Sequence, residues 1–342
     1  MSLSRPAKFP LLKLPWLCIE GVFRSWDIFD ILFFAAISKK TRRIVKSFKI
    51  PLNRIGISVT DTTKIWLCGF SKTWNFSKPS LKSSFDHNSR KTSLMLQDIL
   101  LPLYISRTND DITSYIYGNT IDALKLAMKF LNEMFKCSVE RVNIDAVNFP
   151  ESGEVGVRST RNLYITHHKT QSLGSAQNQK MSSLLKNLEV TDICSFWATN
   201  TELDFYCDPK LFKCKELQFV SSVAWVTLEI LLQFEVPRLT LINCLFSVED
   251  ILSFVTNWFH SDNKKLEYLY IPYQRQKFSS ENFQTAELSP VPFSERNCVP
   301  VSESFGGEVD FSKGLEIVRY DGLRATIHVG EERFVFYIWH NQ

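Results

Sequence analysis

The first fifty residues carry hydrophobic positions at helical spacing. Pro15 can occupy the first position of a helix, where its missing N–H needs no partner, and Ile19 and Phe23 then recur on one face. Asp27 and Ser38 are typical N-caps for a second and a third helix. Three helices this short bury little surface among themselves, so we expect a docking module that another polypeptide covers. The alternative is an ordinary helical subdomain packed on the rest of the chain.

Beyond residue 50 the pattern alternates between strands and helices. Residues 54–59 and 139–147 alternate as strands, and a long amphipathic helix follows Asn119. Short apolar pairs then recur at intervals of about 20 to 30 residues, which brackets the leucine-rich repeat. These pairs are Val142/Ile144, Leu163/Ile165, Leu188/Val190, Leu217/Phe219, Leu239/Leu241 and Leu266/Tyr268.

Helical patterns over residues 225–234 and 251–259 separate some of these pairs. A strand–helix–strand order within one sheet predicts parallel strands and right-handed crossovers. The body is therefore predicted to be α/β. Two arrangements stay open, a curved stack of leucine-rich-repeat-like strand–helix units with one strand face open to a partner, and a compact α/β sheet.

The last thirty residues predict an antiparallel β-meander that closes the sheet. Its strands cover residues 315–320, 324–329 and 334–339. The Asp321-Gly322 pair between the first two strands is a strong hairpin signal. Residues 71–93 and 274–312 show little apolar periodicity, so we expect exposed loops near both.

The composition and charge of the chain argue against several classes of partner. With 44% hydrophobic and 22% charged residues, the chain of 342 residues has the composition of a soluble globular protein. The net charge of +4 is too small to imply a nucleic-acid partner, and the basic run over residues 39–54 fits a solvated helix face better. Polar residues interrupt 217–236, the one stretch as long as a membrane span, so no membrane partner is expected. Eight cysteines without a Cys-x-x-Cys pattern indicate free thiols in a reducing compartment, cytoplasmic or nuclear.

Patterns typical of catalysis are missing from the sequence. It contains no Gly-x-Ser-x-Gly, and residues 153–156 lack the third glycine and the lysine of a phosphate loop. His167 and His168 could bind zinc, but adjacent strand residues point to opposite faces, which favours a surface or edge position. Cys207 and Cys214 are interpreted as two core thiols. We expect a protein that is not an enzyme and uses no metal or cofactor.

The N-terminal helices also resemble a known family. The matching positions are Leu14-Pro15, Val22-Phe23, Asp27, Asp30-Ile31-Leu32 and Ser38-Lys39-Lys40, and together they resemble an F-box over some forty residues. Thr41 and Trp26 depart from the tryptophan and leucine that the family often has there. The body resembles nematode F-box proteins that carry an F-box-associated domain of type 2, in residues 266–269 and 319–326.

The resemblance implies a tail over residues 1–8, an F-box over 9–50 and a substrate-binding F-box-associated domain over 51–342. It implies the substrate-receptor subunit of an SCF-type cullin-RING ubiquitin ligase, which binds the adaptor, through it a cullin, and an unknown target protein. The implied adaptor-binding residues are Leu11, Leu14, Pro15, Ile19, Val22, Phe23, Ile31 and Leu32. Alternate strand residues such as Gln218, Thr240 and Glu267 are candidate target contacts.

Two other functions stay open. Because Thr41 replaces the usual tryptophan, the chain could be a protein-interaction scaffold without ubiquitin transfer. A nucleic-acid binder that uses residues 39–54 is the third hypothesis, and it predicts a steep salt dependence of binding.

Overall fold

A computed structural model of the chain describes residues 11–48, 50–79, 90–96, 99–105, 111–167, 173–198, 204–220, 223–272, 278–293, 298–300 and 308–340. Helices and strands are mixed throughout, which confirms the α/β class. The chain divides into unit 1, Met1–Ile55 with Thr62–Ser138, and unit 2, Gly56–Asp61 with Val139–Gln342. The predicted tail over residues 1–8 lies outside the described residues.

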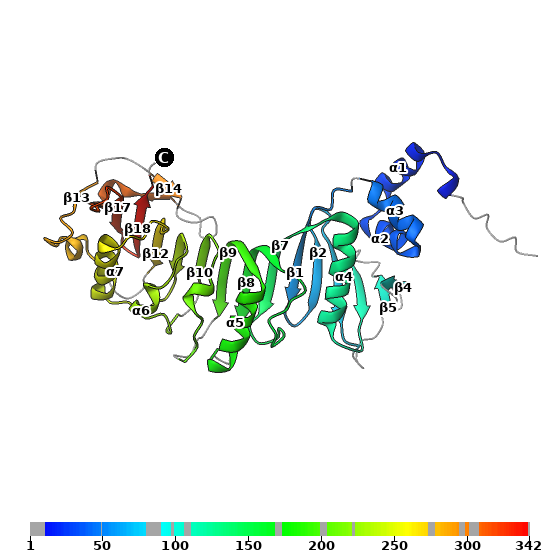
Figure 1. Ribbon diagram of the computed structural model, residues 1–342, viewed down its shortest axis with the longest axis horizontal. Helices are drawn as coiled ribbons and strands as arrows, with labels where there is room; N and C mark the ends of the chain where they lie inside the picture. Colours follow the sequence, from blue (N-terminus) through cyan, green and yellow to red (C-terminus); the bar gives the residue numbers. More distant parts are fainter. Residues whose placement is uncertain are drawn as a thin grey trace, which may run out of the picture. The chain divides into compact units, whose positions relative to one another are not determined.

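Unit 1 joins the N-terminal helices to a small sheet (Figure 1). Its elements are η1 (Leu11–Lys13), α1 (Trp16–Ser25), α2 (Ile28–Ile37), α3 (Lys39–Ser47), β2 (Thr63–Leu67), β3 (Lys72–Ser77), β4 (Arg90–Leu96), β5 (Ile99–Ile105), β6 (Ile112–Tyr115) and α4 (Thr120–Phe135). Its strands follow the order β2-β3-β6-β5-β4, with only the β3–β6 pair parallel. The three predicted N-terminal helices are all present, and we call α1, α2 and α3 the helical module.

Local capping explains where these helices begin. The Asp27 side chain accepts a hydrogen bond from the Phe29 N–H at 2.8 Å, so Asp27 caps α2 as predicted. Ser38 caps α3 and accepts from the Thr41 N–H at 3.1 Å. Pro15 differs slightly from the prediction, because it is the residue before α1 rather than its first residue.

The predicted exposed loop over residues 71–93 is wrong over part of its length. Residues 72–77 form β3, and β4 begins at residue 90. Trp74 and Phe76 point into the core of unit 1, and the Trp74 indole donates to the Ser114 hydroxyl at 3.0 Å. Two buried aromatic residues at strand spacing therefore outweigh a polar, lysine-containing composition. Residues 80–89 of that prediction lie outside the described residues.

Unit 2 contains most of β1 and β7 and all later elements. These are β1 (Arg54–Val59), β7 (Ser138–Asp145), β8 (Ser159–His167), η2 (Ser175–Gln177), α5 (Asn178–Asn187), β9 (Glu189–Ala198), η3 (Pro209–Leu211), β10 (Glu216–Phe219), α6 (Leu228–Leu231), β11 (Arg238–Leu241), α7 (Val248–His260), β12 (Tyr268–Pro272), η4 (Ser280–Phe283), β13 (Val291–Pro292), β14 (Cys298–Pro300), β15 (Glu308–Asp310), η5 (Phe311–Lys313), β16 (Leu315–Val318), β17 (Arg324–Val329) and β18 (Arg333–Trp339).

Strands β7 to β12 lie side by side in sequence order and pair in parallel, as predicted (Figure 1). The register aligns one buried row, Val142, Leu163, Cys194, Leu217, Leu239 and Leu269. Two predicted repeat pairs, at residues 188/190 and 266/268, therefore miss the aligned positions. Helix α6 has only four residues, far shorter than predicted, whereas α7 has thirteen and is capped by the Ser247 side chain. Because the strand–helix repeats differ this much in helix length, the leucine-rich-repeat description stays a prediction.

The antiparallel meander at the C-terminus is confirmed. Strands β16, β17 and β18 pair antiparallel in order, and β18 pairs antiparallel with β12. Gly322 adopts a φ of 84° in the turn between β16 and β17, a conformation that suits glycine.

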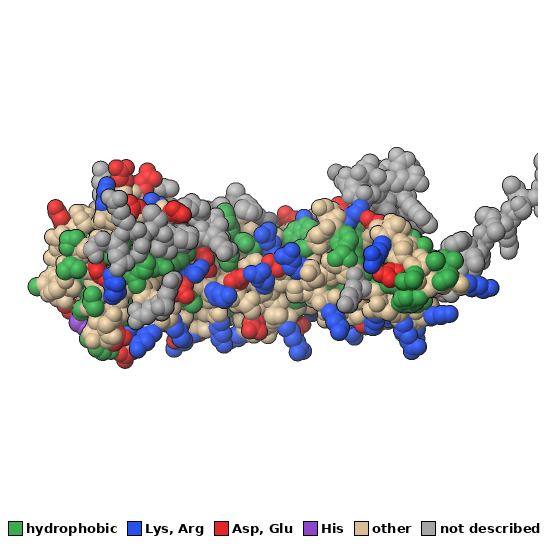
Figure 2. Space-filling view, turned by 90° about the horizontal axis from the view of Figure 1, so that it is seen from above, with side chains coloured by type: hydrophobic (Ala, Val, Ile, Leu, Met, Phe, Trp, Pro, Cys, Tyr) green, Lys and Arg blue, Asp and Glu red, His purple; other side chains and the backbone are tan. Residues whose placement is uncertain are grey.

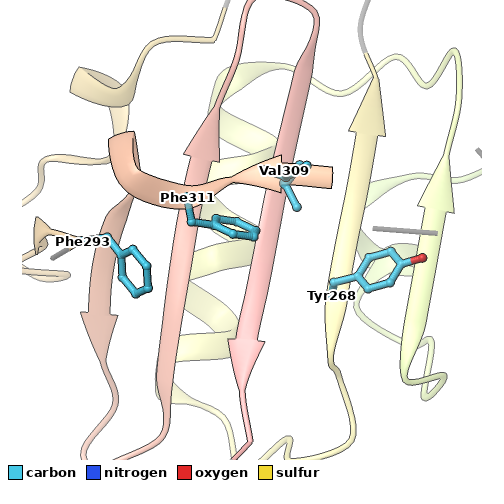
Figure 3. Close-up of a cluster of buried hydrophobic side chains, with 5 residues drawn as sticks. Tyr268, Phe293, Val309 and Phe311 are labelled. Carbon is cyan, nitrogen blue, oxygen red and sulfur yellow. The ribbon is translucent and has the colours of Figure 1, made fainter. Parts of the chain in front are cut away.

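The second predicted loop, residues 274–312, is exposed or half-buried over most of its described residues, and the prediction is wrong only where apolar side chains are buried. Val309 and Phe311 lie across the sheet and pack with Phe293, Tyr268 and Val335 in a buried cluster (Figure 3). Residues 273–277, 294–297 and 301–307 lie outside the described residues. Phe293 and Phe311 cover the face of the sheet opposite to α7, whose Trp258 packs against Phe336 at 5.0 Å. Phe278 and Phe283 of the same segment pack against Phe334, on the face that α7 covers. Within the described ranges, no helix is both long enough and apolar enough to cross a membrane.

Candidate functional site

The eight predicted adaptor-binding residues divide between the interior and the surface of the helical module. Four are buried: Ile19, Phe23, Ile31 and Leu32. Pro15 is exposed, and Leu11, Leu14 and Val22 are half-buried. The prediction therefore mixed residues that stabilise the module with residues that a partner could reach.

An aromatic cluster surrounds Phe23, one of the four buried residues. The ring of Phe23 lies 4.8 Å from that of Phe48, 4.9 Å from Trp26 and 5.2 Å from Phe34, so it joins all three helices. Removing such a side chain from water stabilises a fold by about 1.5–3 kcal/mol. We infer that the buried members shape the module rather than bind a partner directly.

The surface of α1 carries apolar residues that the sequence analysis missed. Trp16 is 49% exposed and Leu17 is 78% exposed, directly after the predicted Leu14-Pro15 pair. Figure 2 shows hydrophobic side chains at the surface of this end of unit 1. An amphipathic reading of α1 could have found Leu17, because it lies off the face that Ile19 and Phe23 share. Together Leu14, Pro15, Trp16 and Leu17 form a short apolar strip, here called the α1 strip.

The two departures from the F-box pattern both have local structural roles. Thr41 is buried, and its hydroxyl accepts from the Ser38 N–H at 3.0 Å, which completes a capping box for α3. Trp26 packs edge-on against Phe34 with ring centroids 5.4 Å apart. Each replaces the family residue with a side chain that the module itself uses.

The helical module also contacts the rest of unit 1. Lys72 lies 3.3 Å from Asp27, and Lys46 of α3 lies 2.8 Å from Glu133 of α4. The hydrogen bond from Lys46 is the main reason that the pKa of Glu133 is lowered. These ion pairs are partly exposed and worth at most about 1 kcal/mol each. The module is thus anchored on one side, as the subdomain hypothesis requires, while the α1 strip stays exposed.

The candidate target contacts in unit 2 are not free. Gln218 and Thr240 are fully buried, and Gln218 donates to Glu216 at 2.5 Å. Glu267 is exposed but accepts from Arg238 at 2.6 Å. They were predicted as alternate strand residues on an open face, but both faces of β10 are buried, so Gln218 is not available to a partner.

The closing motif of the resemblance forms an ionic clamp around a buried arginine. Arg319 is buried and donates from Nε and Nη2 to the two carboxylate oxygens of Asp321, at 2.9 and 2.7 Å. Its Nη1 donates to the backbone oxygen of Asn263 at 2.9 Å, and its guanidinium lies 5.0 Å from the ring centroid of Trp258. Tyr320 donates to Asp262. The motif therefore ties the β16–β17 turn to the end of α7.

The charges of this clamp shift each other's proton affinity. The hydrogen bond from Arg319 holds the pKa of Asp321 far below its usual range, and burial opposes that shift only partly. The pKa of Arg319 is raised by the same bond. Because the Arg319 guanidinium makes its charged hydrogen bonds inside the chain, it is suited to stabilising the fold rather than to binding a partner.

The prediction for His167 is wrong, and the prediction for the two cysteines is confirmed. His167 is fully buried at the end of β8, so the predicted surface or edge position is wrong, and His168 lies outside the described residues. Cys207 and Cys214 are buried free thiols, as predicted. Burial raises the pKa of Cys207 to about 12. Across the described ranges, no three His, Cys, Asp or Glu side chains are grouped to hold a metal ion.

Comparison with known proteins connects part of unit 2 to a family. Residues 209–271, from η3 to β12, match the family described as "F-box associated". The chain is also similar to an uncharacterized protein of Caenorhabditis elegans, with 27% identity over 140 residues. That alignment covers 39% of this chain and 32% of the relative, so the chain spans about a third of the relative's length. No solved structure matches the chain.

Proposed function

We propose that this chain is the substrate-receptor subunit of an SCF-type ubiquitin ligase, with the helical module as an F-box that binds the adaptor and unit 2 as part of the target-binding body. The match of residues 209–271 to a family associated with F-boxes carries the proposal. The chain makes no covalent bond in this scheme. It raises the effective concentration of target lysines near a conjugating enzyme that the cullin holds.

Adaptor contact is assigned to the exposed part of the module. Leu14, Pro15 and Val22 keep the role that the sequence suggested, with Leu11 at the start of the surface and Leu17 added. The buried residues act indirectly, because Ile19, Phe23, Ile31 and Leu32 hold the helices at fixed distances. Burial of two exposed aliphatic side chains by a partner supplies a few kcal/mol before the cost of association.

The direct test is co-purification with the recombinant adaptor. The double variant Leu14→Ala with Pro15→Ala should lose the adaptor, while its thermal unfolding changes little because Pro15 is exposed and Leu14 is only half-buried. Leu245→Ala is the matched control, since Leu245 is equally apolar and 78% exposed but belongs to unit 2. Full retention of the adaptor by the double variant would remove the proposal.

The scaffold hypothesis has the module bind the adaptor without ubiquitin transfer, or no longer bind it. Thr41 was the feature that favoured it, and the capping box gives Thr41 a role that leaves adaptor binding possible. Reconstituting the complete ligase with proteins that co-purify with the chain separates the two functions. Ubiquitin transfer to a co-purified protein supports the receptor, and stable binding without transfer supports the scaffold.

A further inference from the structure

A second apolar surface of unit 1 lies along the boundary between α2 and β4. Its groove has a volume of about 710 Å³. The side chains that matter for its chemistry are Phe33, Phe34 and Ile37 of α2 and Ser93, Leu94 and Met95 of β4. Its lining includes none of the eight residues predicted to bind the adaptor. The groove is therefore a separate surface, and an inference from it does not rest on the proposed function.

The groove runs along the edge of a strand. Leu94 is buried on the inner face of β4, whereas Ser93 and Met95 are exposed on its outer face, and all three line the groove. β4 is the outermost strand of the unit 1 sheet and pairs with β5 on one side. Within the described residues no strand pairs with its other side. Alternate backbone N–H and C=O groups of β4 therefore face outward, ready to pair with another strand.

The helix beside this edge is apolar on nearly every side. Asp30 is the only charged residue among the ten of α2. Its inward residues fill the module, but Ile37 is 72% exposed, and Met95 across the groove is 47% exposed. A helix that is hydrophobic all round is normally covered, and on α2 the uncovered apolar side chain is Ile37.

We propose that the groove binds an extended segment of a partner protein, which adds to β4 as a further strand. The outward backbone groups of β4 specify an extended occupant, because only a strand can pair with them in sequence. The apolar lining specifies aliphatic or aromatic side chains at alternate positions. Asp30, the one charged residue of the lining, specifies a basic side chain in the same segment. The binding mode is β-strand addition, with main-chain pairing for affinity and the groove for selectivity.

The test uses the full chain and a fluorescein-labelled peptide of seven residues that alternates valine and lysine. Two further peptides carry backbone N-methyl groups, one at the odd and one at the even amides. An N-methyl group removes a donor, and in a strand only alternate amides face the neighbour. We expect saturable binding of the parent peptide by fluorescence anisotropy, with one methylated peptide binding like the parent and the other at least tenfold weaker.

Variants of the chain locate the site. Ile37→Lys should weaken the parent peptide at least tenfold, and Asp30→Asn should weaken it by a smaller factor that shrinks as salt is added. Leu245→Lys is the control, since it makes the same kind of change at an equally exposed residue outside the groove. All three replaced residues are exposed, so thermal unfolding should match the wild type.

Four results would overturn the inference. They are the absence of saturable binding, equal binding of both methylated peptides, an unchanged affinity in Ile37→Lys, and a dimer of the chain that the peptide dissociates. The last would show that the occupant is a second copy, and sedimentation at the same concentrations detects it. Adaptor binding by Ile37→Lys is measured separately, so failure of this inference is distinguishable from failure of the proposed function.

Discussion

The two motifs that carry the sequence resemblance have opposite environments. In unit 1, Leu14 and Pro15 lie at the surface and begin the α1 strip. In unit 2, Arg319 lies buried, and its guanidinium is engaged by Asp321, Asn263 and Trp258. Both motifs are short and both point to the same family, but the arginine that begins the second is buried and engaged within the chain. A motif can thus mark a family through its fold or through its binding surface, and burial separates the two cases.

The largest expected effect follows from the buried motif. Arg319→Leu removes the Arg319 hydrogen bonds to Asp321 and to the Asn263 carbonyl, so the free energy of unfolding of unit 2 should fall by about 2 kcal/mol. Urea unfolding followed by tryptophan fluorescence measures it. Adaptor binding should not change. A loss below about 0.5 kcal/mol, the range of ordinary surface changes, would contradict the clamp.

A smaller effect, of opposite kind, is expected from the α1 strip. Leu17→Ser should leave unfolding unchanged, because Leu17 is 78% exposed. It should weaken the adaptor complex about tenfold, which corresponds to about 1.4 kcal/mol. Isothermal titration with the adaptor gives the number. An unchanged dissociation constant would exclude Leu17 from the contact and leave the adaptor surface as the sequence alone suggested.

The capping box of α3 should have an intermediate role, inside the module but not at its surface. Thr41→Ala removes the acceptor for the Ser38 N–H and should lower the free energy of unfolding of unit 1 by about 1 kcal/mol. Thr41→Ser keeps the hydroxyl and serves as the control. Equal stability of Thr41→Ala and the wild type, in thermal unfolding followed by circular dichroism, would deny Thr41 this role.

The smallest effect is a pH dependence of the clamp. The folded-state pKa of Asp321 is lowered by Arg319, so the carboxylate contributes its full stability above the pKa of the unfolded chain, about 3.9. That contribution is lost as the pH falls from there through the lowered value. The difference in unfolding free energy between the wild type and Asp321→Asn should be constant from pH 7 to about 5 and shrink below about 4. A difference that does not shrink in acid would contradict the ion pair.

The sequence correctly predicted the elements that depend on residues close together in the chain. The Asp27 and Ser38 caps, the helix after Asn119 and the Asp321-Gly322 turn each depend on residues a few positions apart, and all are present. The parallel strands followed from the alternation of strands and helices along the chain.

Long-range packing produced the errors. Residues 72–77 read as polar, yet Trp74 meets Ser114, forty residues later. Phe311 was placed in a loop because its neighbours show no period, but it packs against Tyr337 at 5.5 Å. Leu32 is a different case: the F-box resemblance assigned it to the adaptor contact, and the structure adds that it is buried in this chain.

Amide hydrogen exchange of the full chain, with and without a saturating concentration of the purified adaptor, tests the central claim most directly. The account predicts slower exchange over residues 11–25, where η1 and the α1 strip lie, and unchanged exchange over β16–β18. Unchanged exchange over residues 11–25 while the adaptor is bound would show that another surface carries the contact. The helical module would then lose its proposed role as an F-box.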